Sequence, residues 1–442
     1  MTKLALTGDS IVQRRLISRS DPQILPLFDL IRSCDVAFTN LEVLPNDYKG
    51  DPALESGGSH FGAPSWVLDE LVDAGFNLFA TATNHSLDYS ISGLEYALEQ
   101  LNRRSLSHAG CGVNLDEARR PAYVTTPHAT VGMVSCASTF AKGQEASRQT
   151  HAMQGRPGLS PLHPESIFEV EQSDFEIVKK LAVGLGLEKR REFLIRLGFE
   201  FDAPEGIFPF NGMKFRQAAK TKHVRRPNQK DLDDILRWVA EMKLVSDIAI
   251  VSLHAHEQGD TKEDPADFII DFARAVIDGG ADIVAGHGPH LMRGIEMYKG
   301  KPIFYSMGNF VGQNEMVQSL PGDSYDRFRV SDQLTPGALY KQRTSDDRLG
   351  FPSDIRYWQT FIPICQFDGG NLTSIEIHPI SLGLGEPRHR RGRPRLASGE
   401  EGHRILNHLQ DLSGVFGSKI RIDGQVGRID VRKDGNSKVL VA

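Results

Sequence analysis

The 442-residue sequence is poor in cysteine, with four widely separated residues and no CxxC pair. This scarcity argues against a disulfide framework and favours buried thiols in a reducing compartment. No apolar run approaches the roughly 20 residues that a membrane-spanning helix needs. Residues 1–9 predict a first strand, because their apolar run is too short for a signal peptide and has no small-residue cleavage site. We therefore expect a cytoplasmic protein with no membrane contact.

An excess of positive charge is also lacking, since 57 acidic residues outnumber 51 basic ones and the formal net charge is -6. This balance argues against a nucleic-acid partner bound over the whole surface. Hydrophobic residues make up 40% of the chain and charged residues 24%, as in ordinary globular proteins with a large core. The length allows roughly one to three domains.

Short apolar runs alternate with segments of helical periodicity, which predicts βα units and a mostly parallel sheet in an α/β fold. Two irregular stretches interrupt this pattern, at 141–230 and 312–357. The run Asp368-Gly369-Gly370-Asn371, between two predicted strands, predicts a hairpin turn. Strands are predicted at 4–7, 35–39, 77–81, 131–136, 248–253, 282–285, 302–306, 361–367 and 374–379, and helices at 22–32, 65–74, 91–103, 231–243, 265–278 and 399–412.

The insertion at 141–230 is polar and charged, with helices predicted at 166–183 and 189–197. It also contains Phe208 and Phe210 in an apolar turn. The segment is either a tolerated surface insertion or a cap over the site, since long insertions are often lids. The two aromatic residues accordingly either line a substrate wall or belong to a core.

We expect a catalytic domain at 1–140 and 231–385, the insertion or cap at 141–230, and a C-terminal tail at 386–442 that packs on the core. The basic run at 388–395 is interpreted as a solvated linker in preference to an anion site.

Carboxylate, amide and imidazole side chains recur just after the predicted strands. In an open α/β sheet the loops beyond the carboxyl ends of the strands meet in one crevice, so groups distant in sequence become neighbours. A single histidine in such a position is usually a surface residue. Five separate strand ends that each carry such side chains are hard to obtain by chance. The set suits divalent Mn, Fe or Zn, and a carboxylate that bridges two cations would form a clamp that activates water. The residues are Asp9, Asn40, Glu42, Asn84, His85, His254, His256, His287 and His290.

Several motifs in order resemble the CapA family of poly-γ-glutamate capsule proteins, which belongs to the calcineurin-like metallophosphoesterase superfamily. The resemblance covers most of residues 4–311 apart from the insertion. It implies a metallophosphoesterase-like α/β/β/α sandwich with an inserted, partly helical cap. The motifs are GD at 8–9, NLE at 40–42, TNHSLD at 83–88, LH at 253–254, GHGPH at 286–290 and YSMGNF at 305–310.

The same resemblance implies roles for these residues around two metal ions. Asp9 and His290 would bind the first metal, and Glu42 would bridge both. His85 would serve as the acid or charge stabiliser near the leaving group, and Asn40 would position water or substrate. Asp88 either orients His85 or caps the following helix. The second metal would be held by Asn84, His254 and His287.

The first motif departs from the superfamily pattern, because Ser10-Ile11 follows Asp9 where an Asp-x-His is usual. This loss of an imidazole leaves occupancy by a single metal open. His256 either supplies the missing ligand or lies behind the ligands. The spacing between His287 and His290 is one residue longer than usual, a feature that CapA-like proteins share.

The expected function is metal-dependent hydrolysis of an amide or isopeptide bond of γ-glutamyl type in a small-molecule or peptide-like substrate. Arg293 is one of few cations near the ligands, together with Arg14 and Arg15, whereas a phosphate monoester needs several donors around its oxygens. Asn309 is either a polar contact to substrate or a turn residue. The alternatives are a small-molecule phosphoesterase and a non-catalytic component of poly-γ-glutamate or capsule biosynthesis.

Overall fold

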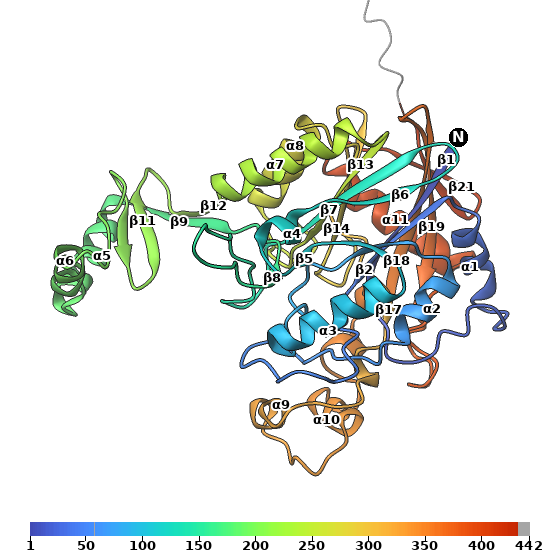
Figure 1. Cartoon of the computed structure of the whole chain (residues 1–442), viewed down its shortest axis with the longest axis horizontal. Coiled ribbons are helices and arrows are strands. Elements are labelled where there is room, and N and C mark those ends of the chain that lie inside the picture. Colours follow the sequence, from blue (N-terminus) through green and yellow to red (C-terminus); the bar gives the residue numbers. More distant parts are fainter. Residues whose placement is uncertain (57, 432–442) are drawn as a thin grey trace, which may run out of the picture.

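Two sheets form the body of the molecule in the computed structural model, which describes residues 1–56 and 58–431 (Figure 1). In the first sheet, neighbouring strands follow the order β21-β22-β19-β18-β1-β2-β3-β4, with β17 beside β1 and β20 beside β19. The strands are β1 (Thr2–Ile11), β2 (Val36–Leu41), β3 (Leu78–Ala80), β4 (Ser107–Ala109), β17 (Asn309–Gly312), β18 (Gln359–Asp368), β19 (Asn371–Ser381), β20 (Arg395–Leu396), β21 (Ile420–Asp423) and β22 (Val426–Ile429).

The second sheet has the order β15-β16-β14-β13-β7-β6, in which β7, β13, β14 and β16 run parallel. Its two edge strands run antiparallel to their neighbours. Two short strands, β5 (Cys111–Gly112) and β8 (Gly158–Leu159), pair beside it. The strands of the second sheet are β6 (Ala122–Thr125), β7 (Thr130–Ala137), β13 (Ile248–His254), β14 (Ile283–His287), β15 (Ile295–Tyr298) and β16 (Lys301–Phe304).

The two sheets pack face to face, and helices cover their outer faces. Successive side chains of a strand point to opposite faces, so one strand serves two cores. Leu4 and Leu6 of β1 belong to the same apolar cluster as Ile250 of β13, between the sheets. Ala5 packs outward with the first helices, and Val251 packs outward with α7 and α8. The helices of the body are α1 (Leu25–Arg32), α2 (Val67–Ala74), α3 (Ser90–Arg103), α4 (Leu115–Arg119), α7 (Gln229–Leu244), α8 (Asp267–Asp278) and α11 (Gly399–Gly414).

Residues 164–227 form an arm that projects from the body, at the left of Figure 1. Its sheet has the order β10-β11-β9-β12, and two helices extend beyond it. A helix was expected over 166–183, but residues 166–170 lie in a strand and the helix begins at Gln172. Ile167, Phe168 and Val170 suit a strand that is paired on both sides, and this pairing overrides local helical periodicity. The arm comprises β9 (Pro164–Val170), α5 (Gln172–Gly184), α6 (Leu187–Arg196), β10 (Phe208–Phe210), β11 (Met213–Gln217) and β12 (Lys222–Pro227).

The second irregular stretch contains α9 (Gly322–Phe328), α10 (Pro336–Arg343) and 3-10 turns at Asn314–Met316, Phe351–Ser353 and Ile355–Trp358. The basic run at 388–395 packs against it, which corrects the expectation of a solvated linker. Arg391 is buried and, like Arg388, pairs with both Glu315 and Asp347. Within the described residues, no helix is long and apolar enough to cross a membrane.

Candidate metal centre

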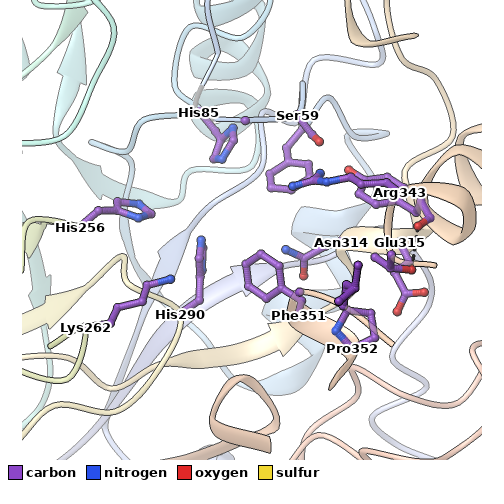
Figure 2. Close-up of a pocket in the computed structure, with 16 residues that line it drawn as sticks. Ser59, His85, His256, Lys262, His290, Asn314, Glu315, Arg343, Phe351 and Pro352 are labelled. Carbon is purple, nitrogen blue, oxygen red and sulfur yellow. Dashed lines mark hydrogen bonds between the residues drawn. The ribbon is translucent and has the colours of Figure 1, made fainter. Parts of the chain in front are cut away.

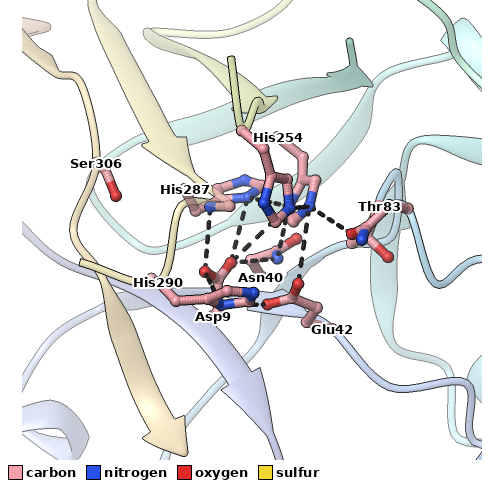
Figure 3. A network of polar contacts seen from close by, with 12 residues as sticks. Asp9, Asn40, Glu42, Thr83, His254, His287, His290 and Ser306 are labelled. Carbon is pink, nitrogen blue, oxygen red and sulfur yellow. Dashed lines mark hydrogen bonds and ion pairs between the residues drawn. The ribbon is translucent and has the colours of Figure 1, made fainter. Parts of the chain in front are cut away.

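The predicted ligands come together because strand register places them side by side within each sheet. Asp9 of β1 is aligned with Asn40 of β2, and His254 of β13 is aligned with His287 of β14. Since the two sheets face each other, the two pairs meet at the same end of the body (Figure 3). Gly8 allows β1 to approach the chain beyond β16, because a Cβ there would collide with the carbonyl oxygen of Gly308.

The two carboxylates of the cluster are fully buried among these histidines. Oδ1 of Asp9 accepts a hydrogen bond from the amide of Asn40 at 2.8 Å, and Oδ2 accepts one from the backbone N–H of Gly288 at 3.1 Å. Nδ1 of His287 lies 3.6 Å from Asp9 Oδ1, and Nδ1 of His290 lies 3.4 Å from Oδ2. Carboxylate oxygens and ring nitrogens therefore point into one small volume.

The polar atoms left without partners show that this cluster fits a cation. Neither carboxylate oxygen of Glu42 has a hydrogen-bond partner among the described residues, and the same holds for Oδ1 of Asn40. Ring nitrogens also face one another, with His254 Nδ1 at 3.0 Å from His287 Nδ1 and His254 Nε2 at 3.1 Å from His256 Nε2. Burying a carboxylate without a partner is costly, and a bound cation would remove that cost.

The pKa values of the cluster favour the forms that bind metal. Burial and the charges of neighbouring histidines lower the pKa of His254 and His256 well below the usual value, and burial lowers that of His287 to about 4. Burial opposes ionisation of Asp9, but contacts with His290, His287 and Asn40 outweigh it and lower the pKa to about 2. Neutral imidazoles and an ionised carboxylate are the states required of ligands. Glu42 differs, because burial and the nearby charge of Asp9 raise its pKa well above the usual value.

The ligand atoms fall into two groups, each with its atoms within 4.8 Å of one another. One group comprises Asp9, His254 and His287, and the other comprises Glu42, His256 and His290. His290 lies close to both groups, since its Nδ1 is 3.4 Å from Oδ2 of Asp9 and 3.6 Å from Oε2 of Glu42. His256 also belongs to the cluster, and Asn84 lies next to it, with Oδ1 2.8 Å from His254 Nε2.

Residues behind the ligands hold the rings in place. Asn309 is buried, and its Oδ1 lies 2.9 Å from Nδ1 of His290. This side chain therefore contacts a candidate metal-binding histidine and does not face the open cavity. His290 itself has a left-handed backbone, with φ of 64°, which is a strained state for a residue with a side chain. Ser252 was not predicted from the sequence, although its Oγ lies 2.7 Å from His287 Nε2. Its position two residues before His254, on the same face of β13, was the signal that could have found it.

His85 is oriented by Asp88, one of the two roles considered for that aspartate. Nδ1 of His85 lies 2.7 Å from Oδ2 of Asp88, and the same oxygen accepts the backbone N–H of Phe61 at 2.6 Å. The residue that precedes α3 is Tyr89, so Asp88 is not its cap. On its other side the ring lies near Asn84, with Nδ2 3.3 Å from His85 Nε2.

A cavity of about 270 Å³ opens onto His85, His256 and His290 (Figure 2). Its walls come from residues 58–61, from Lys262 and from the second irregular stretch, including Arg343 and Phe351. These wall residues were not predicted from the sequence, because an irregular segment carries no periodic signal.

The remaining predicted substrate contacts lie elsewhere. Phe208 and Phe210 lie in β10 of the arm, and Phe208 lines a separate hollow with Phe175 and Lys179. Arg293 is fully buried and is not among the residues that line the cavity; it donates instead to the backbone carbonyls of Glu257 and Lys262, at 2.9 and 3.1 Å. The structure therefore does not bring these three residues to the cavity.

The fold and the cluster together define an α/β protein with a buried candidate metal centre at the facing ends of two sheets. Residues 3–314 match the family described as "Bacterial capsule synthesis protein PGA_cap". The chain belongs to this family, which is part of the metallophosphoesterase-like superfamily.

The chain is also similar to several curated proteins. An uncharacterized protein of Sinorhizobium fredii is 32% identical over 438 residues, which cover 96% of this chain and 92% of the relative. The "PGA biosynthesis protein CapA" of Bacillus subtilis is 26% identical over 242 residues, covering 54% of this chain and 44% of that protein. A "Probable polyglutamine synthesis accessory protein" of Mycobacterium tuberculosis is 25% identical over 345 residues, covering 77% and 63%.

Proposed function

We propose that this protein is a metal-dependent hydrolase that cleaves an amide or isopeptide bond of γ-glutamyl type. The observation that carries the proposal is the pair of fully buried carboxylates, Asp9 and Glu42, surrounded by imidazoles beside an open cavity. A pure assembly factor has no need of such a cluster. The names of these relatives, which refer to PGA biosynthesis and polyglutamine synthesis, favour a glutamyl substrate.

We also propose a fold type and a division of the chain into domains. The two face-to-face sheets with outer helices support the α/β/β/α sandwich of metallophosphoesterases. Residues 1–140 and 231–385 would form the catalytic domain, with 141–230 inserted and the C-terminal segment from 386 packed on the core. Contacts such as Arg391 with Glu315 support the last assignment.

The metal ions, two in this proposal, would be divalent Mn, Fe or Zn. Bound there, they would supply Lewis-acid activation of water and stabilise negative charge on the attacked group. Asn40 holds Asp9 in orientation through its amide hydrogen bond, and its own Oδ1, which has no partner among the described residues, would accept a hydrogen bond from water or substrate. The protein groups that would hold the ions are Asp9, Glu42, Asn84, His254, His256, His287 and His290.

His85 would protonate the leaving nitrogen of the amide. Its ring lines the cavity, and Asp88 accepts a hydrogen bond from Nδ1, so Nε2 would carry the transferable proton. To do so, Nε2 would have to give up its 3.3 Å contact with the amide nitrogen of Asn84, which is itself a donor. An amide nitrogen is a poor leaving group unless it gains a proton, so a positioned acid is needed. His85 is suited to this role because it lies beside the ligands without belonging to either group.

A non-catalytic role in PGA or capsule biosynthesis is the second candidate, since the relatives are named as biosynthesis or accessory proteins. Metal analysis of the purified protein separates the two, followed by an activity screen with γ-glutamyl amides and phosphoesters in Mn, Fe and Zn. We expect stoichiometric metal and metal-dependent amide cleavage. Protein without stoichiometric metal would refute the metal centre. Efficient phosphoester turnover without cleavage of any amide would refute the choice of bond.

A further inference from the structure

Two cationic side chains line the cavity without an acidic partner in the part of the chain that the structure describes. Lys262 follows β13 in a loop, and Arg343 is the last residue of α10. Nζ of Lys262 donates to the hydroxyl of Tyr357 at 2.6 Å, and the Arg343 guanidinium lies 4.3 Å from the centre of the Phe328 ring. Across residues 1–56 and 58–431, neither cation forms an ion pair. Aromatic contacts hold both side chains while leaving their charges available to a ligand.

The other charged group on the cavity wall does not neutralise them. Glu315 lines the cavity, but it already pairs with Arg388 at 3.1 Å and with Arg391. Among the described residues, the wall therefore offers two positive charges without an ion-pair partner to whatever enters the cavity.

The loop that carries Lys262 is held in place before any ligand binds. Arg293, fully buried, donates to the backbone carbonyls of Lys262 and Glu257. The Glu257 side chain in turn accepts from the hydroxyl of Ser138 at 2.7 Å and from that of Thr139 at 2.9 Å. These bonds reduce the ordering that ligand binding would otherwise require. Arg293 is thus a positioning residue for Lys262.

We propose that Lys262 and Arg343 each bind a separate carboxylate of one substrate molecule. Figure 2 shows Lys262 on the side of His256 and His290, and Arg343 across the cavity near Ser59 and Glu315. Two cations set apart in this way match a ligand with two separated negative charges. A phosphate monoester concentrates its charge on one group and would leave one cation unpaired.

This inference rests on the proposed function and narrows its substrate. Each unit of a γ-linked glutamyl chain keeps a free α-carboxylate, so an amide between two such units has negative charge on both sides. The cation pair would therefore select γ-glutamyl compounds with a carboxylate on both sides of the amide over those with only one. An amide with no carboxylates would leave both cations unpaired.

The test measures binding of γ-L-glutamyl-L-glutamate by calorimetry, together with analogues in which one or the other α-carboxylate is a carboxamide. Lys262→Met and Arg343→Met should each weaken binding of the dipeptide by about tenfold or more, as expected for loss of a charged hydrogen bond. Each variant should bind one of the two amidated analogues as well as the wild type does. Lys341→Met is the matched control, since Lys341 lies on α10, pairs with Asp346 and does not line the cavity.

Metal content and melting temperature show whether the variants keep their fold. Failure of the wild type to bind the dipeptide, or equal losses for the dipeptide and both amidated analogues, would overturn the proposal. Charge-dependent binding without cleavage would contradict the hydrolase and leave the two anchors supported. Cleavage that Lys262→Met and Arg343→Met leave unchanged would contradict the anchors and leave the hydrolase supported.

Discussion

Replacing Glu42 with glutamine should stabilise the metal-free protein at neutral pH and remove its response to metal. Glu42 is fully buried beside Asp9, and neither of its carboxylate oxygens has a hydrogen-bond partner among the described residues. Burial and the charge of Asp9 raise its pKa well above the usual value. The folded state then holds a proton that the unfolded state releases, so this group lowers stability as pH rises above its ordinary pKa. Glutamine removes that dependence.

The expected shifts follow from linkage. A ligand at about 100 times its Kd stabilises the folded state by about 2.7 kcal/mol. Unfolding entropy is about 2.1 cal/mol/K per residue, or roughly 0.9 kcal/mol/K for 442 residues, so wild-type melting should rise by about 3 °C. Glu42→Gln loses the charge that would hold a cation, so its melting temperature should not move with metal.

Scanning calorimetry in chelator and in added Mn²⁺, at about pH 6 and about pH 8, tests both halves of the prediction. The advantage of Glu42→Gln over the wild type in chelator should grow with pH. Glu296→Gln is the matched control: this buried glutamate pairs with Arg274 and accepts from the Tyr305 hydroxyl, so its loss should destabilise without changing the metal response. The reasoning is refuted if Glu42→Gln melts lower than wild type in chelator and still gains the full shift with metal.

Three further predictions concern His85, Phe351 and Asp347. His85→Ala should keep its metal by mass spectrometry but lose about 10²- to 10⁴-fold in kcat, as expected for loss of a general acid, and an unchanged kcat would contradict that role. Phe351→Ala should raise KM, because this ring lies 5.5 Å from that of His290 on the cavity wall, whereas Phe208→Ala on the arm should not; the reverse pattern in steady-state kinetics would favour the arm as a cap. Burial opposes ionisation of Asp347, but Arg391 and Arg388 outweigh it and lower its pKa to about 2, so its stabilising effect is complete above about 3.9 and is lost as pH falls through about 2. Asp347→Asn should therefore flatten this part of the acid stability curve in urea titrations, and parallel curves would show that the pair contributes nothing.

The helices, the strands and the candidate ligands at the strand ends were predictable from the sequence, because each is marked by a pattern of neighbouring residues. The apolar run that contains Leu4 and Leu6 marks β1, and Asp9 lies at its end, as His254 lies at the end of β13. Their convergence also required the face-to-face packing of the two sheets, which strand order along the chain does not specify. The end of α2 is marked in the same local way, because Gly75 follows the helix and adopts the left-handed backbone that ends it. The helix expected over 166–183 was wrong at its start, because Phe168 pairs with Phe215 and His223 in strands that lie far along the chain.

The sequence by itself thus determined the α/β class, the strand ends and the histidines and carboxylates that meet there. Only the tertiary structure decided what surrounds them. It brought Arg343 and Phe351 from an irregular stretch to the cavity, turned Arg293 inward to hold the Lys262 loop, and placed Phe208 on the arm. The reason is physical: alternation and helical periodicity record which face of an element is buried, but they do not record which distant segment covers it.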